Sequence, residues 1–94
     1  MTLGNKSYVI EYLQDVHAKD IPALPKSIRE TIKRAIEERL KVDPIGFGKP
    51  LRYSLKGHRR LRVSDYRIVY RIHPTSQRVI IVAITHRKEI YEEF

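Results

Sequence analysis

The segment 57–70, GHRRLRVSDYRIVY, contains four arginines and one acid in a pattern that suits phosphate binding. Its apolar residues alternate with arginines as in a β-strand, where successive side chains point to opposite faces. Leu61 and Val63 can therefore enter a core while Arg60 and Arg62 point away from it. Guanidinium groups bind phosphate oxygens through paired hydrogen bonds, so arginines on a rigid sheet predict a phosphate-binding surface. The four arginines are Arg59, Arg60, Arg62 and Arg67.

Histidine and tyrosine residues near these arginines complete a set that matches metal-free cleavage of RNA. His58 precedes the arginines, and His86 stands directly before Arg87 and five residues before Tyr91. In this reaction the 2′-OH attacks the adjacent phosphorus, and prearranged cations stabilise the charge on the phosphoryl oxygens. The sequence has no histidine–carboxylate spacing of a metal site and no glycine-rich phosphate loop. We therefore expect neither a metal ion nor another cofactor.

The positive charge of the chain is concentrated in its C-terminal half. The formal net charge is +8; residues 1–48 hold eight Lys/Arg against seven Asp/Glu, and residues 49–94 hold eleven against four. Solubility does not require such a concentration, whereas a basic surface attracts polyanions. We therefore expect a nucleic acid partner, and an acidic protein partner is compatible with the same surface.

The composition also bounds the compartment and the number of domains. The 94 residues predict a single domain, 1–94, with a modest core. The chain has no cysteine, and no apolar run approaches the roughly 20 residues of a membrane helix. The N-terminal residues MTLGNKSY have no apolar signal-peptide region. We expect a cytoplasmic protein that does not contact a membrane.

In the N-terminal half, the hydrophobic pattern predicts one strand followed by helices. Alternating apolar residues predict a strand over Lys6–Tyr12, and Leu13–Asp20 could form a short helix. Apolar residues at three- and four-residue spacings predict a longer helix from Pro25 to about Val42. Two glycines and a proline predict a loop over Ile45–Pro50, and Leu51–Leu55 could be a short strand or an irregular segment.

In the C-terminal half, turn residues separate three strands. Ser64-Asp65 predicts a hairpin turn, and a second turn is expected over His73–Ser76. Arg78–Thr85 is apolar at nearly every position, as in a strand inside a sheet. The order of elements predicts an α+β fold: a small, mostly antiparallel sheet with one or two N-terminal helices packed on one face. The other face is then free to bind, with the arginines on it.

The segment RLRVSDYRIVYRI, the turn and apolar strand after it, and then HRKEIY resemble the RelE/ParE superfamily of bacterial toxins, with the RelE-like branch as the closer match. The resemblance covers almost the whole chain and implies the RelE-like fold. It implies an mRNA interferase, a ribosome-dependent endoribonuclease that cuts messenger RNA in the A site. It also implies a cognate, RelB-like antitoxin, which we expect to be acidic, and operator DNA bound only through the antitoxin complex.

The resemblance further implies which residues form the site. Two basic residues of RelE at alternate strand positions correspond to Arg60 and Arg62, and its conserved strand arginine to Arg67. Its later arginine and C-terminal tyrosine correspond to Arg87 and Tyr91. We expect Arg67 and Arg87 to clamp the scissile phosphate. The residues expected to hold flanking phosphates are Arg60, Arg62, Arg59 and His58.

One departure from RelE concerns the proton of the 2′-OH. RelE has lysines where this chain has Arg60 and Arg62. Arginine stays protonated at any working pH and is a poor general base. The proton must therefore pass to another group, for which His86 is the first candidate, Tyr91 the second and His58 the third.

Two other functions remain open on the sequence. A ParE-like toxin shares the fold and inhibits DNA gyrase without catalysis, and a third possibility is a catalytically inactive member that binds antitoxin and DNA. The retention of arginines at 60, 62, 67 and 87 argues against the gyrase inhibitor, which does not need such a cluster.

Overall fold

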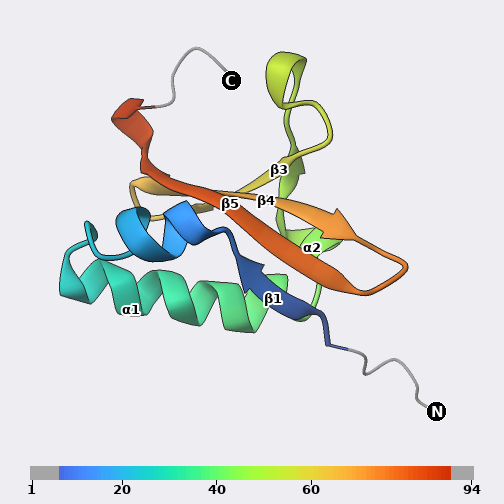
Figure 1. Cartoon of the computed structure of the whole chain (residues 1–94), viewed down its shortest axis with the longest axis horizontal. Coiled ribbons are helices and arrows are strands. Elements are labelled where there is room, and N and C mark those ends of the chain that lie inside the picture. The colour runs from blue at the N-terminus through green and yellow to red at the C-terminus, as the bar shows by residue number, and fades with distance from the viewer. Residues whose placement is uncertain (1–6, 90–94) are drawn as a thin grey trace.

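Five strands form one sheet in the computed structural model of the chain, which describes residues 7–89 (Figure 1). The spatial order is β1-β5-β4-β3-β2. Only β1 runs parallel to its neighbour, β5, and the other neighbouring strands are antiparallel. The strands are β1 Val9–Tyr12, β2 Lys49–Pro50, β3 Arg59–Val63, β4 Tyr66–His73 and β5 Arg78–His86. The predicted mostly antiparallel sheet with β5 in its interior is confirmed.

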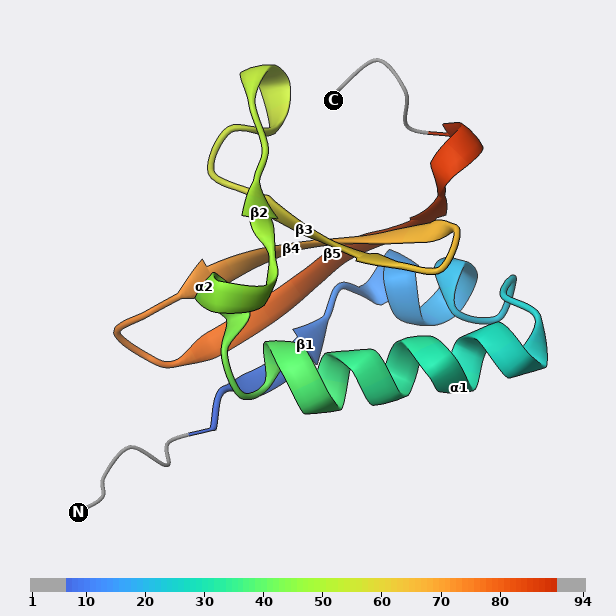
Figure 2. The ribbon, with the colours of Figure 1, turned by 180° about the vertical axis from the view of Figure 1, so that it is seen from behind.

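The helical segments between residues 16 and 40 cover one face of this sheet (Figures 1 and 2). The predicted long helix is α1, Lys26–Ala35, continued by η2, Ile36–Leu40. The short helix expected after the first strand is η1, Val16–Asp20. Pro25 stands just before α1, where its missing N–H removes no helical hydrogen bond. The α+β fold with N-terminal helices on one face is therefore confirmed.

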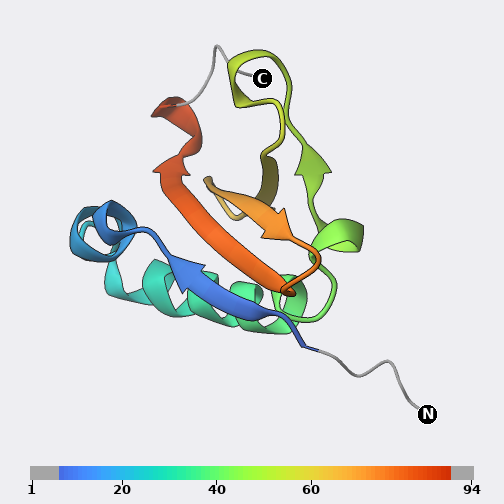
Figure 3. The same cartoon turned by 45° about the vertical axis from the view of Figure 1, so that its right-hand side comes forward.

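The core lies between the helices and the sheet. Its strand residues alternate with residues that face away, as the period of a half-buried strand requires. The buried cluster consists of Val16, Leu24, Ile32, Ala35, Ile36, Leu40, Leu61, Val63, Ile68, Tyr70, Val79, Ile81 and Ile84. Within residues 7–89, no helix packs flat against the second face of the sheet (Figure 3).

The prediction of a loop over Ile45–Pro50 is wrong. Residues Pro44–Phe47 form the helical turn α2, and Lys49–Pro50 form β2. Asp43 caps the turn, because its Oδ1 accepts a hydrogen bond of 3.0 Å from the backbone N–H of Gly46. An acid followed by proline at the first helical position is a helix-start signal that outweighed the glycines.

The segment after β2 contains a helical turn, whereas the sequence left open a short strand or an irregular segment over Leu51–Leu55. Residues Tyr53–Leu55 form η3, and Tyr53 adopts a left-handed φ of 57°. Figures 1 and 2 show this turn rising above the uncovered face of the sheet, and η4, Arg87–Glu89, rises above the same face at the end of β5. The uncovered face therefore has a projecting segment on either side.

A one-residue irregularity interrupts the pairing of β4 with β5. Tyr70 pairs with Ile81, but Val69 pairs with Ala83, so Val82 has no counterpart in β4. A single extra residue in a strand reverses which face the following side chains occupy. The residues of β5 after Val82 therefore point opposite to what simple alternation from its start predicts.

Candidate nucleic-acid interface

Three neighbouring arginines lie together on the sheet face opposite the helices. Arg62 of β3 is paired directly with Arg67 of β4, and Arg60 lies two residues before Arg62. The alternate residues Leu61 and Ile68 are buried in the core, so the arginines point away from it. Directly opposed residues have Cβ atoms about 4.5–5.5 Å apart. The sheet therefore holds these guanidinium groups, here called the arginine cluster, close together.

The charges of the arginine cluster act on one another. Burial lowers the pKa of Arg67 from its usual value, and the charges of Arg60 and Arg62 lower it further. The pKa of Arg60 is likewise lowered by burial and by Arg62. Arginine nevertheless remains protonated at working pH, so these residues form a fixed concentration of positive charge. An anion placed among them would relieve their repulsion.

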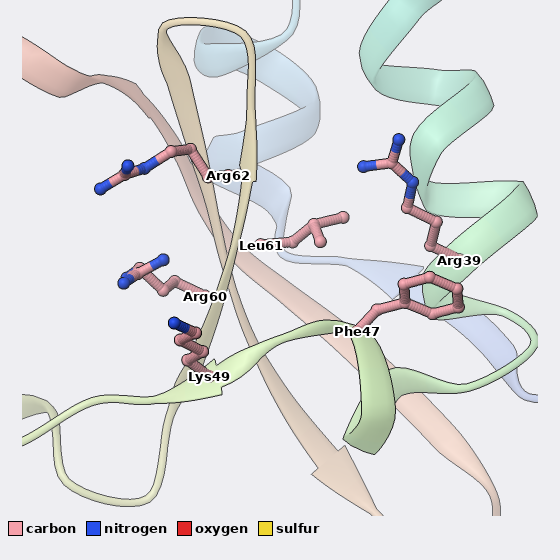
Figure 4. Close-up of a pocket in the computed structure, with 6 residues that line it drawn as sticks. All are labelled: Arg39, Phe47, Lys49, Arg60, Leu61 and Arg62. Atoms are coloured by element: carbon pink, nitrogen blue, oxygen red, sulfur yellow. The ribbon is translucent and has the colours of Figure 1, made fainter.

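Lys49 extends this positive surface, although the sequence analysis did not predict it as a site residue. It pairs with Arg60 across β2 and β3. Figure 4 shows Lys49, Arg60 and Arg62 on one side of β3, whereas Leu61 points to the other side, toward Arg39 and Phe47. The signal that could have found Lys49 was the capped turn at Asp43-Pro44, because a turn there allows the next residues to rejoin the sheet.

Arg59 does not belong to the arginine cluster, although the sequence predicted a phosphate-binding role for it. Its Nη2 donates hydrogen bonds to the carbonyl oxygens of Ile45, at 2.7 Å, and Gly48, at 2.9 Å. The buried hydroxyl of Tyr70 donates a 2.6 Å hydrogen bond to the carbonyl of Pro44. Arg59 and Tyr70 thereby fasten α2 to the sheet, which positions β2 and Lys49.

Arg87 is tied to the turn between β3 and β4. Its backbone N–H donates to the carbonyl oxygen of Asp65 at 2.8 Å. Its Nε lies 3.8 Å from the Asp65 carboxylate in an exposed ion pair. The first residue of η4 is thus held at the end of the sheet where Arg62 and Arg67 are paired, and its guanidinium remains accessible to a ligand.

The structure does not bring His86 to the arginine cluster. His86 pairs with Tyr66, and their rings meet edge to face with centroids 5.1 Å apart. Because Val82 shifts the register, His86 follows Ile84 on the helix side of the sheet, while Thr85 pairs with Arg67 on the uncovered side. A hollow of about 270 Å³ beside His86 is lined by Asp20 and other residues of the η1 region.

The other two candidate proton acceptors are His58 and Tyr91. The carbonyl oxygen of His58 accepts a 2.9 Å hydrogen bond from the N–H of Leu51, which continues the pairing of β2 with β3. Strand alternation then directs the half-buried His58 to the side of Arg60. Tyr91 lies outside the described residues.

Residues 7–89 contain no group of three or more histidines or carboxylates arranged to hold a metal ion. No helix in this part of the chain is long and apolar enough to cross a membrane.

Comparison with known proteins identifies the family. Residues 8–91 match the family described as ParE toxin of the type II toxin-antitoxin system parDE. The chain belongs to this family. It is also 34% identical, over 73 residues, to Toxin RelG of Mycobacterium tuberculosis (strain ATCC 25618 / H37Rv), covering 78% of this chain and 84% of that protein. The expected membership of the RelE/ParE superfamily is thus confirmed, and the chain is a toxin of a type II toxin-antitoxin system.

Solved structures of Rel-type toxins share the fold. A chain of the toxin-antitoxin complex RelBE2 from Mycobacterium tuberculosis superposes with a TM-score of 0.80 at 30% identity, covering 86% of this chain and 99% of that one. The isolated RelE toxin of E. coli gives a TM-score of 0.69 at 20% identity, covering 85% and 84%. At that lower identity the likeness supports the fold alone.

Proposed function

We propose that this toxin is a cytoplasmic, ribosome-dependent endoribonuclease that cleaves messenger RNA in the A site. The single observation that carries the proposal is the pairing of Arg62 with Arg67, beside Arg60, on a face that no helix of the described residues covers. Three guanidinium groups at this spacing suit the transition state of phosphodiester cleavage, because prearranged cations stabilise negative charge as it develops on the phosphoryl oxygens. The identity of 34% to Toxin RelG supports the RelE-like alternative.

In the proposed reaction the 2′-oxygen attacks the adjacent phosphorus and forms a bond to it while the bond from phosphorus to the 5′-oxygen breaks. The products are a 2′,3′-cyclic phosphate and a 5′-hydroxyl. Arg67 and Arg87 hold the scissile phosphate, and Arg60 and Arg62 hold its neighbours. The proton of the 2′-OH leaves to an acceptor, and the 5′-oxygen receives a proton. Neither transfer requires a metal ion or another cofactor.

For the proton acceptor we favour His58 or Tyr91 over His86. A general base must be within hydrogen-bond reach of the proton that it removes. His86 follows the core residue Ile84 by two positions and contacts Tyr66, which argues for a packing role. His58 shares the alternation of Arg60 and Arg62, so it is better oriented toward RNA on the uncovered face.

We further propose that a cognate, acidic, RelB-like antitoxin neutralises this toxin. The related chain of known structure is part of a toxin-antitoxin complex, RelBE2. Over Leu61–Val63 no described strand pairs with the outer side of β3, and such an edge accepts a partner strand or segment. An acidic segment there would also neutralise the arginine cluster. Operator DNA is then bound through the antitoxin complex.

Inhibition of DNA gyrase is the second candidate, because the matching family is described as ParE toxin. A cell-free translation assay with primer extension on the message decides between the two. We expect discrete, ribosome-phased cuts from the wild type and none from the folded double variant Arg67→Ala/Arg87→Ala. Arg71→Ala, which removes an exposed arginine of β4, is the matched control and should still cut. Intact message together with inhibited supercoiling would establish the gyrase function instead.

A further inference from the structure

A groove of about 330 Å³ passes the outer edge of β3 beside the arginine cluster. Its polar lining is entirely cationic among the described residues, and its remaining lining consists of one aromatic ring and one leucine. The lining residues are Arg39, Phe47, Lys49, Arg60, Leu61 and Arg62 (Figure 4). The positive charge of this groove favours an anionic ligand, and its exposed aromatic ring favours a ligand with an apolar surface.

Phe47 is the unusual member of this groove. The residue is 49% exposed, although burial of a phenylalanine is strongly favourable. The backbone that carries it is well held, since the N–H of Phe47 donates to the carbonyl of Asp43 at 3.2 Å and Arg59 binds the adjacent Gly48. A rigid turn therefore presents an uncovered aromatic ring on the side of β3 that Arg39 shares, with Lys49, Arg60 and Arg62 across the edge of the strand.

We propose that this groove is a nucleobase site, in which one base of single-stranded RNA stacks on Phe47. Arg39, on the same side of β3 as Phe47, offers a second planar group to the base, and the phosphates on either side lie against Lys49 and Arg60. Proteins that bind single strands combine a positive groove with aromatic stacking platforms in this way. The inference deepens the proposed function and rests on it.

The dimensions of the groove favour a nucleotide over a protein segment. Its volume is at the low end of the roughly 300–1,000 Å³ typical of small-ligand pockets. A single planar base with its phosphate fills such a space, whereas a bound helix or strand needs an elongated groove. Phe47 and Arg39 are also both planar groups, and arginine and aromatic planes are the common stacking partners of unstacked bases.

The test compares two uncleavable oligonucleotides of equal length: a 2′-O-methyl RNA hexamer and its abasic counterpart. We expect Phe47→Leu to weaken binding of the base-containing hexamer by about 5- to 100-fold, the value of one lost base–aromatic stack. Binding of the abasic chain should not change. Arg60→Ala should weaken both. Tyr12→Leu, which removes an exposed ring at the opposite edge of the sheet, is the matched control and should weaken neither.

The outcomes separate this inference from the proposed function. If Phe47→Leu has no effect, or weakens both oligonucleotides equally, the base site is wrong, while a loss with Arg60→Ala still supports the RNA surface. If the wild type binds neither oligonucleotide at low salt, the base site fails, whereas the proposed function is decided separately by the primer-extension assay. The chain has no tryptophan, so Phe47→Trp adds a single fluorophore. Quenching by the hexamer supports the base site, and quenching only by an acidic, apolar peptide would overturn it.

Discussion

Arg62 and Arg67 stand directly opposite each other on adjacent strands. Like charges in this position destabilise a sheet, and the burial of Arg67 separately disfavours its charged form. The arrangement therefore opposes folding of the hairpin. An anion bound between the two side chains would compensate their repulsion. It also distinguishes the arginine cluster, which we propose binds RNA, from Arg59, whose guanidinium hydrogen-bonds to backbone carbonyls within the chain.

A first prediction concerns the stability of this pair. Arg62→Gln should raise the free energy of unfolding by about 0.2–1 kcal/mol, because it removes one of two opposed like charges. The same substitution should weaken RNA binding and cleavage. Urea denaturation followed by circular dichroism measures the first effect. A clear loss of stability in Arg62→Gln would contradict the repulsion inferred here.

A second prediction separates Arg59 from the arginine cluster. Arg59→Ala should lower the free energy of unfolding by about 1–3 kcal/mol, because two carbonyl groups lose a charged donor. Arg71→Ala, on an exposed position of β4, should change it by no more than about 0.5 kcal/mol. Equal effects of the two substitutions in urea denaturation would rule out the anchoring role of Arg59.

A third prediction is a pH dependence that arises from Tyr70. Burial raises the pKa of Tyr70 above its usual 10.0; Arg59 opposes the shift and Asp43 adds to it. The folded state therefore holds this proton more tightly than the unfolded chain. The resulting stability is complete below about pH 10 and is lost as the pH rises through the higher folded-state pKa.

The measurement for Tyr70 is the free energy of unfolding between pH 8 and about pH 11, where exposed tyrosines also begin to ionise. The wild type should lose stability above pH 10 more steeply than Tyr70→Phe. Tyr12, whose pKa is raised by burial and by Glu37, contributes the same trend in both proteins and cancels in the comparison. Parallel curves for the two proteins would show that Tyr70 does not cause the dependence.

A fourth prediction concerns the proton acceptor. His86→Gln should retain cleavage within a few-fold, whereas loss of a true general base typically costs about 10²–10⁴-fold. His58→Gln and Tyr91→Phe, assayed in the same primer-extension experiment, identify the acceptor by such a loss. The folded state of each variant is checked by circular dichroism, because His86 packs against Tyr66. A loss of that size in a folded His86→Gln protein would restore His86 as the acceptor.

The sequence determined the features that depend on local periodicity and on charge. The alternation in RRLRV placed Arg60 and Arg62 opposite Leu61 and Val63 because a strand has a period of two residues. The apolar stripe from Ile28 to Leu40 specified the helix and the face that it buries. The excess of basic residues after position 48 indicated an anionic ligand, because a basic surface attracts polyanions.

Only the tertiary structure decided which of these side chains meet. One extra residue in β5, Val82, reverses the faces of the residues after it and moves His86 away from the arginine cluster. A bulge of this kind depends on how β5 pairs with β4, which no local pattern records. The tertiary structure also decided the positions of Arg59 and Lys49, because α2 folds back on the sheet. Arg59 there reaches carbonyl groups 11 and 14 residues away, and Lys49 lies beside the arginine cluster.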